Sequence, residues 1–219
     1  TNTVKITVNN FDPGSISSDQ TICENTAQIP LTSVSPTGDG TFTYRWFSSI
    51  DGTNFNPIGG AISETYNPGM LIADTWYKRE VTSTLNGKKC IEETNTVRIT
   101  INNFVPGSIS ADQTICEGDT PMAFTSVTPT GDGTFTYQWK ISTDGIVFTD
   151  IAAAQSEAYS SGPLTQDTWF KRAVISTLNT FTCTEETNMV KVTVINFTPG
   201  SIASDQTICE GTAPAAFTS

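Results

Sequence analysis

The sequence predicts an all-β protein built from tandem antiparallel β-sandwich repeats of about 93 residues, which together form a rod. Three observations lead to this prediction. Cys23, Cys116 and Cys209 are spaced 93 residues apart, each within the same six letters, DQTICE. Short segments in which apolar and polar residues alternate recur at the same spacing, as expected for half-buried strands. Clusters of Gly, Asn, Asp and Pro separate these segments and are typical of turns.

The repeat covers the whole chain. The nine letters PTGDGTFTY occur at 36–44 and again, unchanged, at 129–137. We therefore expect the C-terminal strand of a preceding repeat at residues 1–13, a first repeat at 14–106, a second at 107–199 and the N-terminal part of a following repeat at 200–219. In this prediction the array continues in both directions, and residues 3–8 persist as a strand through contacts of Phe11 with the first repeat.

The strands follow from a period of two. In residues 42–46 three aromatic side chains alternate with polar ones, and residues 97–101 and 190–194 alternate Val or Ile with polar residues. One face of each strand is therefore apolar. We place Trp46 and Trp139 in the core of their repeats. The alternative, a platform on which sugars stack, is disfavoured by their position within an alternating stripe.

The junction between the repeats is predicted to be stiff. Residues 102–106 lead directly into Gly107 without a Gly/Ser-rich tether, and they contain Phe and Pro. A short segment of this composition restricts swinging. Phe11, Phe104 and Phe197 occupy the same junction position, and each is expected to pack at a contact between domains.

The cysteines predict structural disulfides. Each repeat holds two cysteines 67 residues apart, so we pair Cys23 with Cys90 and Cys116 with Cys183, and leave Cys209 unpaired. Such pairs are typical of extracellular proteins. A bond closing a loop of this size stabilises a fold by roughly 4 kcal/mol in the chain-entropy model. The alternative, redox or metal chemistry, is disfavoured because the chain has no His and no CxxC.

Composition argues against several functions. With 22 acidic and 11 basic residues the formal net charge is −11, which disfavours nucleic acid and anionic membrane surfaces as partners. No apolar stretch is long enough to span a bilayer. The lack of His excludes Ser-His-Asp and Cys-His catalysis, and there is no phosphate-binding glycine loop. We therefore predict neither catalytic residues nor a cofactor.

Two further groups of residues allow sharper hypotheses. Four aspartates in Gly-rich turns are weak candidates for calcium, with tight turns as the alternative: Asp39, Asp51, Asp132 and Asp144. Lys78 with Asn95, and Lys171 with Asn188, are candidates for an isopeptide bond, which the disulfides make unnecessary. Arg79 and Arg172 are expected to pair with a carboxylate such as Asp74 or Asp167.

The motifs of the second repeat resemble a known family. TYQWKISTDG, LTQDTWFKR and EETNMVKVTV, together with ICEGT at the start of the next repeat, are similar to the immunoglobulin-like repeats of giant surface adhesins of gliding bacteria, the SprB type. The resemblance implies immunoglobulin-like sandwiches in a long filament on the bacterial outer surface, exported by type IX secretion and carried by the gliding motor.

The expected function is therefore structural: the repeats are a stalk that holds an adhesive part of the protein away from the cell. Their partners are neighbouring repeats and, if the module also binds, surface polysaccharide or the substratum. Exposed Phe47 and Phe55 would favour such binding, although Lys140 replaces Phe47 in the second repeat. Accessory repeats of a secreted hydrolase are the remaining alternative.

Overall fold

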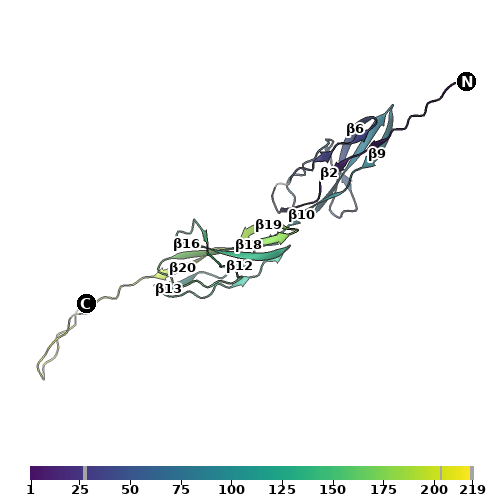
Figure 1. Ribbon diagram of the computed structural model, residues 1–219. Helices are drawn as coiled ribbons and strands as arrows, with labels where there is room; N and C mark the ends of the chain where they lie inside the picture. The colour runs from purple at the N-terminus through teal and green to yellow at the C-terminus, as the bar shows by residue number, and fades with distance from the viewer. Residues whose placement is uncertain (27–28, 203, 218–219) are drawn as a thin grey trace.

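The computed structural model describes residues 1–26, 29–202 and 204–217 and shows two all-β modules arranged end to end (Figure 1). The first module contains β1–β10, and the second contains β11–β20. The strands of the first module are β1 Phe11–Asp12, β2 Ser15–Ile16, β3 Gln20–Cys23, β4 Ser33–Val34, β5 Thr37–Gly38, β6 Thr41–Ser49, β7 Asn56–Pro57, β8 Thr75–Leu85, β9 Lys88–Glu93 and β10 Val97–Asn102. Those of the second are β11 Phe104–Val105, β12 Ser108–Ile109, β13 Gln113–Cys116, β14 Ser126–Val127, β15 Thr130–Gly131, β16 Thr134–Ser142, β17 Thr149–Asp150, β18 Thr168–Leu178, β19 Phe181–Glu186 and β20 Val190–Ile195.

Each module is a β-sandwich with one large sheet. In the first module the order is β3-β10-β8-β6-β7, with β9 also paired to β8, and the second module repeats this order. The pairing is antiparallel except that β3 runs parallel to β10, and β13 parallel to β20. Short pairs, β1 with β5 and β2 with β4, lie outside this sheet. The predicted fold class is confirmed, with one parallel pair in each large sheet.

The two modules form an elongated molecule with the chain ends at opposite extremes (Figure 1). The C-terminal end of β10 meets the β18–β19 hairpin of the second module, so neighbouring modules touch through their ends. Within the described residues, no helix has the length and apolar character required to cross a bilayer.

The predicted core positions of the two central tryptophans are confirmed. Trp46 and Trp139 are fully buried, and each indole N–H donates to a backbone carbonyl oxygen, at 2.9 Å from Ser63 and Ser156 respectively. Because a buried indole requires a partner for its N–H, these bonds fix the ring orientation as well as its burial. The tryptophans therefore belong to the core and cannot form a sugar-stacking platform.

The longest strand turns polar as well as apolar side chains into the sandwich. In β8 the buried side chains alternate, and the last three are Arg79, Val81 and Ser83. Arg79 is fully buried, its guanidinium lies over the ring of Tyr44, and it donates to the carbonyl oxygens of Glu64 and Pro13. Burial lowers the pKa of Arg79 below its usual value. This polar half of the core faces the segment by which the chain enters the module.

The expected pairing of the two buried arginines with strand-end carboxylates is wrong. Arg172 has the same environment as Arg79 and donates to Glu157 and Pro106 carbonyl oxygens. Asp74 instead pairs with Arg98, and Asp167 with Lys191. The reason is the alternation of the strand, since Arg79 points into the sandwich, whereas Asp74 lies at its surface.

The expectation that residues 3–8 persist as a strand is also wrong. Residues 1–10 contain no strand, and Val4, Ile6 and Val8 are 71–86% exposed. Their counterparts in β10 are buried because β10 lies between β3 and β8. Alternation alone does not hold a strand that has no neighbours.

The β18–β19 hairpin contains a strained turn. Asn179 and Thr180 both have positive φ, 49° and 67°, whereas the first module has Asn86-Gly87 at this turn. A two-residue turn of this type requires positive φ at both positions, and a β-branched residue there is unfavourable.

We expect Thr180→Gly to stabilise the chain by about 1 kcal/mol, because Gly adopts positive φ without a steric penalty. Urea unfolding of the whole chain measures this. The matched variant Gly87→Thr introduces the same strain into the first module and is expected to destabilise by a similar amount. An unchanged or lower midpoint for Thr180→Gly contradicts the assignment of strain.

Candidate functional site: the junction between the modules

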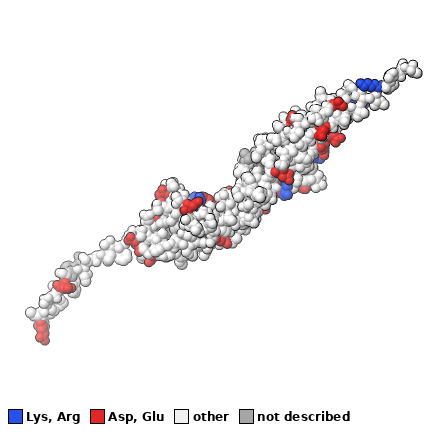
Figure 2. All heavy atoms as spheres, in the orientation of Figure 1, with Lys and Arg blue, Asp and Glu red and all other residues white. Residues whose placement is uncertain are grey.

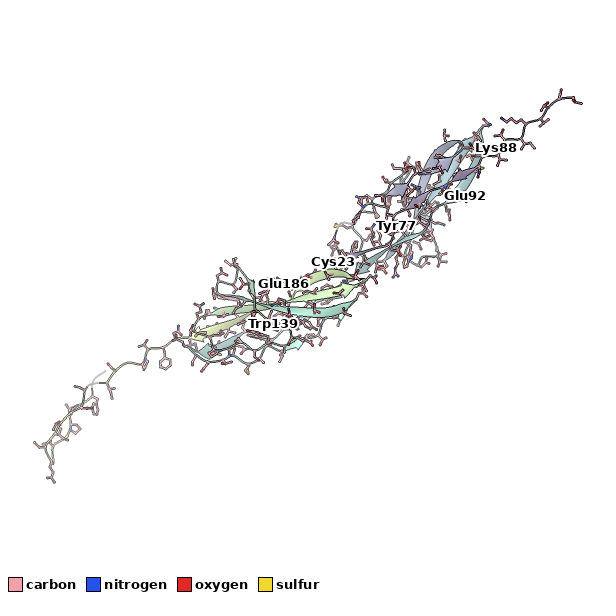
Figure 3. All side chains as sticks on the ribbon, viewed as in Figure 1. Cys23, Tyr77, Lys88, Glu92, Trp139 and Glu186 are labelled. Atoms are coloured by element: carbon pink, nitrogen blue, oxygen red, sulfur yellow. A yellow bond between two sulfur atoms is a disulfide. The ribbon has the colours of Figure 1, made fainter. Side chains whose placement is uncertain are left out.

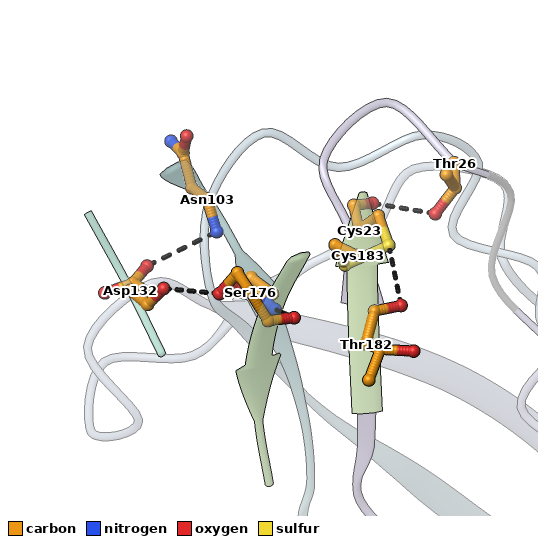
Figure 4. The surroundings of a disulfide bond; sticks show 8 residues. Cys23, Thr26, Asn103, Asp132, Ser176, Thr182 and Cys183 are labelled. Carbon is orange, nitrogen blue, oxygen red and sulfur yellow. Dashed lines mark hydrogen bonds between the residues drawn. A yellow bond between two sulfur atoms is a disulfide. The ribbon is translucent and has the colours of Figure 1, made fainter. Parts of the chain in front are cut away.

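One disulfide joins the two modules. Cys23 in β3 of the first module is bonded to Cys183 in β19 of the second, with their Cα atoms 5.6 Å apart, and Cys90, Cys116 and Cys209 are free cysteines (Figure 4). The predicted pairs, Cys23 with Cys90 and Cys116 with Cys183, are therefore wrong. The bond links neighbouring repeats instead of closing each one.

The strand register explains why a bond within a module does not form. Cys90 pairs with Ser83 in β8, while Cys23 lies beside Asn102 at the far end of β10. Eight ladder positions along β8 and three more along β10 separate these levels, on the order of 35 Å at the usual rise per residue. A disulfide requires Cα atoms within about 7 Å. Figure 3 shows Cys23 facing the second module, with Lys88, near Cys90 in sequence, at the opposite end.

A buried polar contact lies next to the disulfide. Asn102, the ladder partner of Cys23, is 2% exposed and donates through Nδ2 to the carbonyl oxygen of Ser176 at 3.2 Å. The Ser176 hydroxyl donates back to Asn102 Oδ1 at 2.9 Å. Ser176 is itself the ladder partner of Cys183. Two adjacent residues of one module therefore contact two adjacent residues of the next, one pair covalently and one by hydrogen bonds.

The repeated letters TGDGT form the socket for this contact. The carbonyl oxygen of Asp132 lies 2.6 Å from the Ser176 hydroxyl, and the Asp132 N–H donates to the Asn103 carbonyl oxygen at 2.8 Å. Gly131 has φ of 119°, and a Cβ there would lie 2.5 Å from the Asn103 oxygen. Only glycine permits this approach. In the first module Asp39 and Gly38 contact residues 10 and 11 in the same way.

Each of the first five residues of the DQTICE motif has a defined contact. Asp19 accepts from the Arg98 N–H at 2.7 Å, aligning β3 with β10, and Gln20 donates to the Ile29 carbonyl oxygen at 3.1 Å. Thr21 accepts from Asn179 of the second module at 3.2 Å. Ile22 lies in the core, and Cys23 forms the bond to the next module. The motif therefore combines an edge strand with a docking site for the following module.

The four calcium candidates do not converge. Asp39 and Asp132 lie in the sockets just described, and Asp51 and Asp144 form separate turns. Asp144 accepts from the Ile146 and Val147 N–H groups and from the Ser142 hydroxyl, and these bonds lower the pKa of its carboxyl group. Among residues 1–26, 29–202 and 204–217 no group of three or more acidic, His or Cys residues is placed to hold a metal ion. The observed role of these aspartates is turn and socket formation.

Other predicted contacts also differ. Phe104 packs on Phe135 of its own module, with ring centroids 5.7 Å apart, because β11 pairs with β15 there, and Phe197 is 75% exposed. By the predicted bounds, 14–106 and 107–199, the Phe104–Phe135 contact joins two repeats as expected, and Phe11 packs on Phe42 in the same way. The expectation fails for Phe197, which is exposed. The candidate isopeptide groups are engaged elsewhere: Lys78 pairs with Glu93, and the Asn95 amide bonds both backbone groups of Ile16.

Aromatic side chains outside the core are partly covered. Phe47 and Phe55 are half-buried, and the Lys78 ammonium lies 5.9 Å and 4.7 Å from their ring centroids. In the second module Lys140 stands in place of Phe47, and Lys171 lies over Phe148. The repeated feature of this face is therefore a cation over an aromatic ring and not an open aromatic platform.

We expect Asn102→Ala to destabilise the second module by about 1–3 kcal/mol, because two buried hydrogen bonds are lost. Urea unfolding monitored by tryptophan fluorescence measures the loss. Asn9→Ala is the matched control, since Asn9 makes the same bonds to Ser83 but is only partly buried, so water replaces it at lower cost. Equal, small effects of both variants would show that the junction contact carries no stability.

Comparisons with known proteins agree with two copies of one domain. A search of curated protein sequences finds no match. Among solved structures, a chain described as "Sidekick-1 immunoglobulin domains 1-5" is similar at 12% identity and a TM-score of 0.37, covering 82% of this chain and 36% of that one. This chain thus spans about a third of the length of that structure. A domain family described as "Domain of unknown function (DUF8696)" matches residues 12–103 and 105–196, which is most of the chain. The chain therefore belongs to this family and carries two consecutive copies of its domain.

Proposed function

We propose that these modules form a stiff extracellular spacer, the stalk of a large cell-surface adhesin. The observation that carries the proposal is the junction, where the Cys23–Cys183 bond and the Asn102–Ser176 contact lie side by side. A module that only tethers another domain needs no such fixation. Two adjacent attachments restrict both bending and twisting, which is the property required of a stalk.

Charge and redox chemistry support an extracellular setting. Disulfides persist in oxidising compartments and are rare where thiols are kept reduced. Acidic side chains are distributed over both modules on the visible face, where basic ones are few (Figure 2). With a net charge of −11, parallel rods repel one another, which keeps them separate at a crowded surface.

The assignment to a gliding adhesin of the SprB type, with type IX secretion, rests on the resemblance of the second repeat's motifs to that family. The elongated shape and the fixed junction are consistent with it. In this proposal adhesion belongs to another part of the protein, and the modules set the distance between that part and the cell.

A second candidate, binding of polysaccharide, is favoured by one feature. The outer face of β16 and β18 has a shallow groove of about 700 Å³, lined by residues that include Gln138, Lys140 and Ala173. Module 1 has Glu80 where Ala173 stands, so the groove is not a repeated feature. Polysaccharide binding in this groove would therefore involve only the second module. The stalk explains the features that both modules share, which build the junction.

Antibody labelling of living cells tests the stalk. Antibodies raised against the second module are expected to label filaments on intact cells of the producing organism, because the modules are exposed along the stalk. Removal of the label by brief surface proteolysis is the control for an external location. Protein found only in the culture medium would contradict the stalk and favour accessory repeats of a secreted enzyme.

A further inference from the structure

The two outer ends of this two-module unit carry cysteines at the positions of the two that are bonded at its centre. At the far end of the second module, Cys116 lies in β13 beside the end of β20, as Cys23 lies in β3 beside β10. Cys116 is an exposed free thiol, and Thr114 occupies the position of Thr21, which accepts from Asn179 at the junction. This end therefore presents the cysteine and the threonine that receive a hairpin in the middle of the molecule, with Ile195 at the position of Asn102.

The opposite end carries the complementary hairpin. Asn86 and Cys90 in the β8–β9 hairpin correspond to Asn179 and Cys183 in the β18–β19 hairpin, and Cys90 is also a free thiol. Ser83 already exchanges hydrogen bonds with Asn9 in the way that Ser176 does with Asn102. The non-covalent half of the junction is thus formed before the first module as well, by the chain segment that leads into it.

We propose that the Cys23–Cys183 bond is the repeating linkage of an array, in which every module is bonded to the next. Cys116 bonds to the hairpin cysteine of a following module of this family, and Cys90 bonds to the β3 cysteine of a preceding one. The partner is a module of the same family because the central junction shows a β3 cysteine of one such module bonded to the hairpin cysteine of the next. Cys90 and Cys116 cannot form a disulfide with each other within one molecule, since they lie at opposite ends of the rod.

The linkage forms by thiol–disulfide exchange with a disulfide oxidant, such as oxidised glutathione or an oxidoreductase disulfide. One cysteine thiolate attacks the oxidant and releases one of its sulfurs as a thiol. The second cysteine thiolate then attacks the mixed disulfide and releases the other. Two electrons and two protons pass from the protein thiols to the oxidant, which is reduced to two thiols.

This pattern of bonds makes the array almost inextensible. A continuous covalent path runs through three successive modules. It crosses the disulfide from the β3 cysteine of the first module to the hairpin cysteine of the second. From there it follows the backbone to the β3 cysteine of the third module. The last part corresponds to Cys183–Cys209, 26 residues, which span at most about 90 Å when fully extended. Two folded modules cover about 80 Å, from the ladder positions and the rise per residue. Pulling therefore cannot lengthen the array appreciably even if its modules unfold.

A three-module chain tests the proposal. Residues 1–199 followed by a second copy of residues 107–219 add one module and preserve the Pro-Gly junction. After oxidation and proteolysis without reduction, mass spectrometry is expected to find Cys116 of the second module bonded to the duplicated Cys183, in addition to the Cys23–Cys183 bond. The Cys116→Ser variant of this chain is expected to lose only the added bond.

Force spectroscopy on the same chain gives an independent readout. Because the Cys23–Cys183 bond alone removes 160 residues from the extensible path, the comparison is with the oxidised Cys116→Ser variant. The oxidised chain is expected to extend by about 26 residues less than that variant, or roughly 90 Å at about 3.6 Å per residue. If Cys116 stays free in the folded three-module chain, or bonds to a cysteine of its own module, the proposal is overturned. Equal extension of the oxidised chain and its oxidised Cys116→Ser variant would overturn it as well.

Discussion

The structure depends on one constraint, the paired contact of Cys23 and Asn102 with Cys183 and Ser176. Cys23 and Asn102 are neighbours across the parallel β3–β10 ladder, and Ser176 and Cys183 are neighbours across the β18–β19 ladder. Each pair is therefore held rigidly by its own sheet. A covalent bond beside buried hydrogen bonds then transmits the orientation of one sheet to the other, so the rod behaves as one body instead of two tethered ones.

This constraint explains why two stretches of sequence are repeated so closely. DQTICE builds the surface that receives the next module, and PTGDGTFTY builds the socket that receives the preceding chain segment. Gly131 and Asp132 act through backbone approach and backbone hydrogen bonds, so changes there cannot be compensated by a side chain. The polar half of the core also holds the entering chain segment, because the buried Arg172 donates a hydrogen bond to the Pro106 carbonyl oxygen. Stability of each module and fixation of its neighbour are therefore coupled.

The sequence alone was sufficient for the strands and the core, because alternation with a period of two reports which side of a strand is buried. It placed Trp46 and Trp139 correctly for this reason. It failed on the disulfide, since a 93-residue period fits bonds within a repeat and between repeats equally well. A signal was present in the first repeat: Cys90 follows the Asn86-Gly87 turn by three residues, which places it at a hairpin tip, far from the end of β3. The expected partners of Arg79 and Arg172 were also wrong, because a buried arginine bonded to carbonyl oxygens has no sequence pattern of its own.

Disulfide mapping of the native two-module chain tests the central claim most directly. Proteolysis without reduction, followed by mass spectrometry, separates the peptides that contain Cys23, Cys90, Cys116 and Cys183. The structure predicts that the peptide with Cys23 is linked to the peptide with Cys183, while Cys90 and Cys116 are alkylated as free thiols. Linkage of Cys23 to Cys90 and of Cys116 to Cys183 would contradict the fixed junction and return each module to an independent unit.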